Sequence, residues 1–187
     1  GLGSGANALT LIRSLGHGPT PLRLVSFDKT LEPLRFGLGH ARALGFYSGL
    51  EAQTQQIVDT GASAFSWKGH PVQWDVRLAD FPTLLAAGAS RTLPKPHAIL
   101  YDAYSPRRNP EMWTLPVFER VRTLLAEDRP CALATYSRST LLRVTLLLAG
   151  FWVGSGARTG EKEETTVASN RRELAGSLLD RKWLERV

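Results

Sequence analysis

The sequence Gly1-Leu2-Gly3-Ser4-Gly5-Ala6-Asn7 fits the pattern GxGxGxN and precedes a helical apolar stripe. Glycine adopts positive φ at little cost and has no Cβ to obstruct a ligand that lies on the backbone. Asp28 follows 23 residues after Gly5, at the end of the apolar run 22–27. An acidic residue at about this spacing, roughly twenty residues on, binds the ribose hydroxyls of a nucleotide cofactor. The pattern therefore predicts a nucleotide-cofactor loop at the start of the chain.

Strand patterns alternate with helix patterns beyond this loop, which is typical of α/β proteins. Three of the apolar runs end in a carboxylate, at Asp28, Asp80 and Asp102. In an open parallel sheet these ends meet along one edge, where ligands bind. The expected strands are 22–28, 65–67, 72–78, 98–101, 131–136, 151–153 and 165–168, and the expected helices are 7–15, 30–44, 51–58, 84–87, 114–125, 139–149 and 172–183.

The length of 187 residues suits one domain with a sizeable core. We expect this domain to occupy residues 1–170, with residues 171–187 forming a C-terminal helix packed on it. Because a glycine loop of this type normally follows a strand, we also expect the first strand to precede residue 1.

Composition excludes several classes of protein. The single cysteine, Cys131, rules out an internal disulfide and a cysteine-based metal cluster, and four scattered histidines show no metal spacing. The longest apolar stretch, 145–154, is too short to span a bilayer. We therefore expect a cytoplasmic protein with no metal and no membrane partner. The net charge of +6 is concentrated in residues 81–156, which permits a polyanionic partner.

The cofactor loop and Asp28 alone do not distinguish NAD from S-adenosylmethionine, since both present a ribose. The expected terminal hairpin and the carboxylate at Asp80 favour the methyl donor. Asp80 and Phe81 are then placed to meet its adenine, although Asp80 also suits a helix N-cap.

The segment 101–113 holds the expected reaction centre. Methyl transfer is an in-line displacement that needs an aligned nucleophile. Asp102 at a strand end can accept the N–H bonds of an amine nucleophile, or contact the cofactor instead. Tyr104 and Trp113 offer flat faces for a base, and Arg107 with Arg108 suits phosphate contacts. For Trp113 the alternative is a core anchor at the start of the next helix, and for the two arginines it is a solvated loop.

A family resemblance then follows from specific residues. The sequence Asp102-Ala103-Tyr104-Ser105-Pro106-Arg107-Arg108-Asn109-Pro110-Glu111-Met112-Trp113 resembles the Asp-Gly-Phe-Ala-Pro-x-x-Asn-Pro-Asp-Met-Trp stretch of MnmC-type tRNA methyltransferases. The loop 1–7 resembles that family's Gly-x-Gly-x-Gly-x-Asn, and 134–137 is similar to its Ala-Thr-Phe-Thr. The chain departs from the family at three positions. The family has Gly in place of Ala103, Phe in place of Tyr104 and often Glu in place of Asp28.

The resemblance implies a class I, Rossmann-like, S-adenosylmethionine-dependent methyltransferase fold, with a mostly parallel sheet and a C-terminal antiparallel hairpin. The implied reaction methylates the aminomethyl group on carbon five of the wobble uridine in tRNA, in a stand-alone methyltransferase form. The expected catalytic residues are Asp102 and Tyr104. The expected cofactor contacts are Gly1, Gly3, Gly5, Asn7, Asp28, Lys29, Asp80, Phe81 and Asp102, and the expected tRNA contacts are Ser105, Arg107, Arg108, Asn109, Trp113, Arg138 and Arg143.

Three alternatives stay open from the sequence. A methyltransferase acting on another amine, in a small molecule or a protein, would not need arginines along one rim. A dinucleotide-dependent oxidoreductase would bind NAD in preference to S-adenosylmethionine. A non-catalytic RNA-binding module would bind tRNA without the cofactor.

Overall fold

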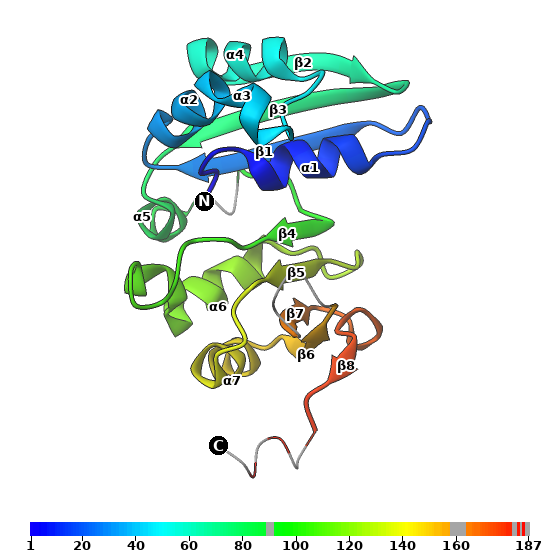
Figure 1. Cartoon of the computed structure of the whole chain (residues 1–187). Helices are drawn as coiled ribbons and strands as arrows, with labels where there is room; N and C mark the ends of the chain where they lie inside the picture. Colours follow the sequence, from blue (N-terminus) through cyan, green and yellow to red (C-terminus); the bar gives the residue numbers. More distant parts are fainter. Residues whose placement is uncertain (89–91, 158–163, 181–182, 184, 186–187) are drawn as a thin grey trace. The chain divides into compact units, whose positions relative to one another are not determined.

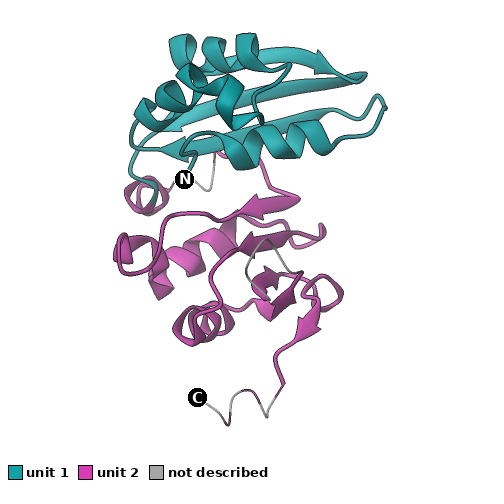
Figure 2. Cartoon of the chain, viewed as in Figure 1, with its two compact units in different colours: residues 1–81 teal, residues 82–187 magenta. Residues whose placement is uncertain are grey.

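The computed structural model describes residues 1–88, 92–157, 164–180, 183 and 185. The chain divides into two compact units, unit 1 (Gly1–Phe81) and unit 2 (Pro82–Val187), shown in teal and magenta in Figure 2. The predicted domain over residues 1–170 includes parts of both units and stays a prediction. None of the helices in the described ranges is both long and apolar enough to cross a bilayer.

Unit 1 contains a three-stranded sheet with helices packed on it (Figure 1). β1 (Leu22–Asp28) pairs in parallel with β3 (His70–Leu78), and β2 (Ala62–Trp67) pairs antiparallel with β3, so the order is β1-β3-β2. The helices are α1 (Ala6–Ser14), α2 (Glu32–Gly39), α3 (Ala41–Leu44) and α4 (Glu51–Thr60).

The core of unit 1 follows from the alternation of β3. Val72, Trp74 and Val76 point to the same face and are buried, as period two requires. They join one apolar cluster with buried residues of the helices, among them Leu9, Ile12, Leu34 and Ile57. Burial of each large apolar side chain contributes about 1.5–3 kcal/mol. This cluster therefore fixes the helices on the sheet and holds the loop before α1 in place.

Unit 2 contains a five-stranded sheet in the order β4-β5-β7-β6-β8. Only β4 (Ala98–Leu100) and β5 (Ala132–Thr135) run parallel among the pairings described in this sheet. β6 (Trp152–Gly156) and β7 (Thr165–Ser169) form the predicted antiparallel hairpin, which is confirmed. The helical elements are α5 (Phe81–Ala86, beginning at the last residue of unit 1), η2 (Pro110–Trp113), α6 (Leu115–Leu124) and α7 (Thr140–Leu148).

The predicted C-terminal α-helix is wrong over residues 172–180. A short 3-10 turn, η3 (Arg172–Leu174), is followed by β8 (Ser177–Leu178), which pairs antiparallel with β6. Gly176 adopts φ +65°, a conformation that ends a helix. A Cβ at Gly154 would lie 2.0 Å from the Ala175 carbonyl oxygen, so only glycine lets this backbone approach β6. The rest of the prediction falls on residues 181–182, 184 and 186–187, which lie outside the described residues.

Candidate functional site

The glycine loop in unit 1 forms a tight turn directly before α1. Gly3 and Gly5 adopt φ values of +54° and +82°, in the left-handed region that favours glycine. The Gly5 N–H donates to the Leu2 carbonyl at 2.9 Å, which closes the turn. A Cβ at Gly3 would meet nothing within 4 Å, so this glycine borders open space. The loop therefore has the backbone shape and the free surface that a bound ligand requires.

Asp28 binds this loop at the end of β1. Its Oδ2 accepts hydrogen bonds from the Leu2 N–H at 2.9 Å and the Gly3 N–H at 3.0 Å, and its Oδ1 accepts one from the Lys29 N–H at 2.8 Å. Charge-assisted bonds of this kind are about twice as strong as neutral ones. The carboxylate is thus held at a fixed position beside the glycine turn, where the sequence placed it.

Lys29, Asp80 and Phe81 lie together at the ends of the parallel strands β1 and β3. The Lys29 Nζ is 2.7 Å from the Asp80 Oδ1, and both side chains are partly exposed. The Phe81 ring packs on Phe27, with ring centroids 4.8 Å apart. The Ala79 N–H donates to the Asp28 carbonyl at 2.9 Å, which joins the two strand ends. Unit 1 therefore brings the predicted cofactor residues of the loop, β1 and β3 to one edge.

Sequence reasoning missed Tyr47, which contacts the same loop from the segment between α3 and α4. Its hydroxyl donates to the Ser4 carbonyl, and its side chain is fully buried. Residues 45–71 carry no strong periodicity, so the sequence offered only the flanking Gly45 and Gly49 as a sign of a turn there. The contact depends on a fold that brings residues 43 positions apart together.

The loop after β4 carries the predicted reaction centre in unit 2. The Tyr101 N–H donates to the Ala134 carbonyl at 2.8 Å, which continues the β4–β5 pairing to the residue before Asp102. Asp102 is exposed, and Tyr104 is 73% exposed with φ +59°. A residue other than glycine in this region is strained, and such strain is often found at functional sites. Asp102 and the Tyr104 ring are both accessible on one loop.

The remainder of that loop is fixed by its own hydrogen bonds. The N–H groups of Arg108 and Asn109 both donate to the Ser105 carbonyl, at 2.9 and 3.0 Å. The Asn109 Nδ2 donates to the Ala103 carbonyl at 3.3 Å. A cavity of about 450 Å³ is lined by Ser105, Arg107 and Arg108. Asn109 therefore shapes the loop, and the two exposed arginines line a space that an anion can enter.

Trp113 is buried, in contrast to Tyr104. It is 8% exposed and lies edge-on to Tyr101, with ring centroids 5.3 Å apart. The Tyr101 hydroxyl donates to the Met112 carbonyl and fixes the same turn. The Trp113 Nε1 is buried without a hydrogen-bond partner among the described residues. This environment favours the core-anchor interpretation of Trp113 over base stacking.

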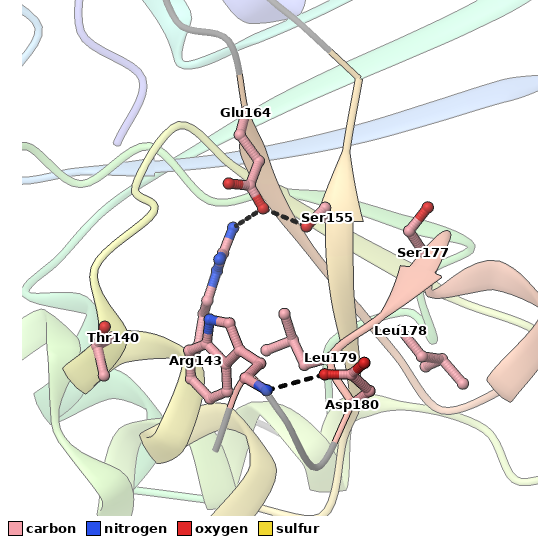
Figure 3. Close-up of a pocket in the computed structure, with 9 residues that line it drawn as sticks. Thr140, Arg143, Ser155, Glu164, Ser177, Leu178, Leu179 and Asp180 are labelled. Atoms are coloured by element: carbon pink, nitrogen blue, oxygen red, sulfur yellow. Dashed lines mark hydrogen bonds and ion pairs between the residues drawn. The ribbon is translucent and has the colours of Figure 1, made fainter. Parts of the chain in front are cut away.

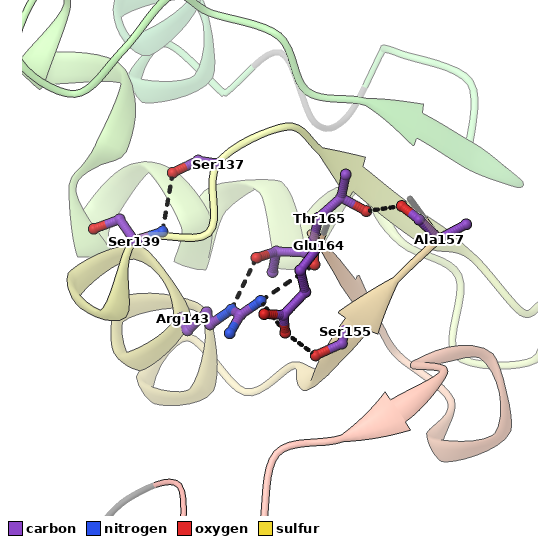
Figure 4. A network of polar contacts seen from close by, with 8 residues as sticks. Ser137, Ser139, Arg143, Ser155, Ala157, Glu164 and Thr165 are labelled. Carbon is purple, nitrogen blue, oxygen red and sulfur yellow. Dashed lines mark hydrogen bonds and ion pairs between the residues drawn. The ribbon is translucent and has the colours of Figure 1, made fainter. Parts of the chain in front are cut away.

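Arg143 is also buried, which argues against its predicted contact with tRNA. Its side chain is 5% exposed, and its Nη2 lies 2.8 Å from the Glu164 Oε1. Its Nε donates to the Thr166 Oγ1 at 3.0 Å, and its Nη2 also donates to the Thr165 carbonyl at 3.2 Å (Figure 4). A guanidinium occupied in this way is not available to a phosphate. Arg138 is exposed, and its contact with tRNA stays a prediction.

A second cavity, of about 480 Å³, lies in unit 2 beside this ion pair (Figure 3). The Arg143 guanidinium lies over the Trp183 ring, 6.0 Å from its centroid, and the backbone N–H of Trp183 donates to the Asp180 Oδ1 at 2.8 Å. The lining comprises Thr140, Arg143, Ser155, Glu164, Ser177, Leu178, Leu179, Asp180 and Trp183.

Within the described ranges, no group of three or more His, Cys, Asp or Glu side chains is arranged to hold a metal ion.

A protein-family model described as S-adenosyl-L-methionine-dependent methyltransferase matches residues 50–171, which is more than half of the chain. The chain belongs to this family. The match includes Asp80, Asp102, Tyr104 and the arginines of the following loop. The S-adenosylmethionine-dependent methyltransferase family, the fold class and the cofactor that the sequence predicted are therefore confirmed, and the tRNA substrate and the individual site residues stay predictions.

Curated relatives carry the description tRNA 5-methylaminomethyl-2-thiouridine biosynthesis bifunctional protein MnmC. The one from Nitrosospira multiformis is 38% identical over 85 residues, which is 44% of this chain and 14% of the relative. The one from Aeromonas hydrophila is 29% identical over 179 residues, which is 88% of this chain and 26% of the relative. The chain thus spans about a quarter or less of the length of these two relatives.

A solved structure also shares the fold. The crystal structure of MNMC2 from Aquifex aeolicus superposes with a TM-score of 0.54 at 21% identity, covering 95% of this chain and 61% of that one. At this identity the likeness concerns the fold alone. It supports the Rossmann-like class I architecture that the sequence predicted, to which the structure adds the antiparallel pairing of β2 and the strand β8.

Proposed function

We propose that this chain is the methyltransferase part of a tRNA-modifying enzyme, which methylates the aminomethyl group on carbon five of the wobble uridine. The observation that carries the proposal is the loop after β4. It presents the exposed Tyr104 ring in a strained conformation two residues from Asp102, and its arginines line a cavity. The names of the curated relatives support the same substrate.

The residues of unit 1 fit S-adenosylmethionine. Gly3 leaves open space where a side chain would stand, so a ligand can lie against the loop backbone. We assign the ribose hydroxyls to Asp28, and the adenine to Asp80 and Phe81, whose ring packs on Phe27. The proposed cofactor contacts also include Gly1, Gly5, Asn7 and Lys29. Bound S-adenosylmethionine supplies an electrophilic methyl group on a sulfonium sulfur.

Asp102 is assigned to the amine nucleophile. The uncharged aminomethyl nitrogen would direct its lone pair at the methyl carbon. As the N–C bond formed, the bond from that carbon to sulfur would break, the neutral thioether S-adenosylhomocysteine would leave, and the nitrogen would then release a proton. A carboxylate that accepts an N–H bond from this amine aligns the lone pair and provides an acceptor for the proton. The position of Asp102, exposed immediately after the paired end of β4, suits this role.

The tRNA is assigned to the loop 104–109 and to Arg138. The Tyr104 ring can stack on the target base, an interaction worth about 1–3 kcal/mol. Arg107, Arg108 and Arg138 are exposed cations that suit the phosphates on either side of that base. Ser105 and Asn109 fix the loop that presents these groups.

The test is transfer of a tritiated methyl group from S-adenosylmethionine to tRNA, using the full-length protein that contains this chain. The substrate is tRNA that carries the unmethylated aminomethyl group, and the control is the same tRNA without that group. Label at the wobble uridine of the first tRNA alone is the expected result. Cofactor binding without label would direct the search to other amines, and tRNA binding without cofactor binding would favour a non-catalytic RNA-binding module.

A further inference from the structure

Tyr47 and Asp28 bind different parts of the glycine loop. Asp28 accepts the N–H groups of Leu2 and Gly3, at the start of the turn. The Tyr47 hydroxyl donates to the Ser4 carbonyl, at the end of the turn. Burial raises the pKa of Tyr47, so its hydroxyl stays protonated and remains a donor at neutral pH.

Gly37 in α2 provides the space for this contact. A Cβ at position 37 would lie 2.1 Å from the Tyr47 hydroxyl oxygen and 3.1 Å from the Ser4 Cβ, so any larger residue must displace them. The φ of Gly37 is not in the left-handed region, so backbone conformation does not require glycine there. Close approach of the tyrosine hydroxyl and the loop is the physical reason for glycine at this position.

The segment that carries Tyr47 is itself fastened to α1, the helix that follows the glycine loop. The Arg13 Nη1 donates to the Ser48 carbonyl at 2.9 Å and to the Gly45 carbonyl at 3.3 Å. The Leu50 N–H donates to the Tyr47 carbonyl at 2.7 Å, directly before α4 begins. Tyr47 is therefore attached to rigid elements on both sides, and its hydroxyl can impose a position on Ser4.

We propose that Tyr47 is a positioning residue for the cofactor loop, and that Gly37 is required for it to act. The proposal rests on the assignment of the glycine loop to S-adenosylmethionine. Gly3 and Gly5 make many conformations accessible to an unrestrained loop. Ordering such a loop on binding reduces the net binding free energy of the cofactor, unless the protein has already ordered it. The Tyr47–Ser4 hydrogen bond orders the loop before the ligand arrives.

The experiment compares the full-length wild-type protein with Y47F, which keeps the buried ring and removes only the hydroxyl. The control is T54V, which removes another buried hydroxyl of unit 1 that donates to a backbone carbonyl, that of Leu50 at 2.8 Å. Calorimetry measures the Kd of S-adenosylmethionine, and hydrogen–deuterium exchange follows the amides of residues 2–6 without ligand. Urea unfolding verifies that each variant is folded at the temperature of the assay.

We expect Y47F to weaken cofactor binding about tenfold, as the loss of one hydrogen bond predicts, and to speed exchange of the 2–6 amides. The KM for S-adenosylmethionine should rise by a similar factor with kcat nearly unchanged, since uniform binding is lost. T54V should match the wild type in both measurements. Unchanged amide exchange in Y47F, whatever its stability, overturns the proposal, whereas failure of the wild type to bind the cofactor counts against the proposed function.

The variant G37A tests the second half of the proposal. Alanine is a better helix former than glycine, so propensity alone predicts no loss at this position in α2. We expect G37A to weaken cofactor binding at least as much as Y47F, because the added Cβ displaces the hydroxyl. In the Y47F background the same change should add less, since the 2.1 Å contact with the hydroxyl is gone and only the two approaches of 3.1 Å, to the Ser4 Cβ and the ring Cζ of residue 47, remain. Independent, multiplicative losses in the double variant would show that the two residues do not act through one contact.

Discussion

The Arg143 guanidinium and the Glu164 carboxylate form an ion pair at 2.8 Å that joins α7 to the start of β7. Arg143 is buried and Glu164 is 37% exposed, so the pair reaches from the core of unit 2 to its surface. Ser155 on β6 also donates to the same carboxylate oxygen. A helix and both strands of the terminal hairpin therefore depend on one carboxylate.

The first prediction concerns the stability of this arrangement against acid. The hydrogen bonds from Ser155 and Arg143 lower the pKa of Glu164 below its usual value. Its contribution to stability is therefore fully present above the unfolded pKa, about 4.3, and is lost as the pH falls through the lower folded pKa. E164Q should lower the free energy of unfolding by about 1 kcal/mol at pH 7, since solvent screens this partly exposed carboxylate, and the difference should shrink below pH 4. Urea unfolding at both pH values measures it, and a difference that grows in acid contradicts the assignment.

The second prediction concerns Asp28, which accepts two N–H groups of the glycine loop and is assigned to the ribose. D28N replaces a charged acceptor by a neutral amide, and we expect the Kd of S-adenosylmethionine to rise about 10- to 100-fold. The matched control is D59N, at an exposed aspartate on α4 whose partner is Gln55. Equal cofactor affinity in D28N and D59N, by calorimetry, would remove Asp28 from the site.

The sequence predicted those parts of the fold whose signals are local. β1 and its terminal Asp28 follow from a short apolar run with a carboxylate at its end, and the β6–β7 hairpin from two β-rich runs. Strands were expected at 65–67 and 72–78, but their pairing as the β2–β3 hairpin was missed because its turn is Lys68-Gly69 rather than Asn-Gly. Both turn residues adopt positive φ, at +49° and +90°, as a type I′ hairpin turn requires.

The remaining errors concern contacts between residues distant in the sequence. Nothing in the sequence near Arg143 indicates that its guanidinium will be buried and paired with Glu164, 21 positions later. The C-terminal residues have helical spacing, but the close approach permitted by Gly154 makes them pair with β6 instead. The candidate site was predicted where it lies on loops next to strand ends, and missed at Tyr47, whose contribution depends on packing.

The third prediction separates chemistry from binding at Asp102. D102A should lower kcat by about 10²-fold or more, because the amine loses its aligned acceptor, with little change in the Kd for tRNA. Single-turnover transfer of the tritiated methyl group measures the first quantity, and filter binding measures the second. Parallel losses in turnover and tRNA affinity would instead make Asp102 a binding residue.

The fourth prediction uses the strained backbone of Tyr104. Y104A removes the ring and should weaken tRNA binding by about 5- to 100-fold, as expected for the loss of base stacking, whereas Y104F should bind like the wild type. Y104G also lacks the ring but relieves the positive φ, so it should be more stable than Y104A by about 1 kcal/mol. Tight tRNA binding by both ringless variants would argue against stacking at this position.

The fifth prediction concerns the arginines that the structure leaves exposed. R107A, R108A and R138A should each weaken tRNA binding, and each lost phosphate contact should reduce the slope of log affinity against log salt by about 0.7–0.9. R120A, at an exposed arginine on α6, is the matched control and should keep the wild-type slope. Because these side chains are assigned to phosphates and not to the reacting amine, kcat at saturating tRNA should change little. A slope unchanged in all three variants would mean that the tRNA backbone lies elsewhere, and that the cavity beside Arg107 and Arg108 serves a smaller anion.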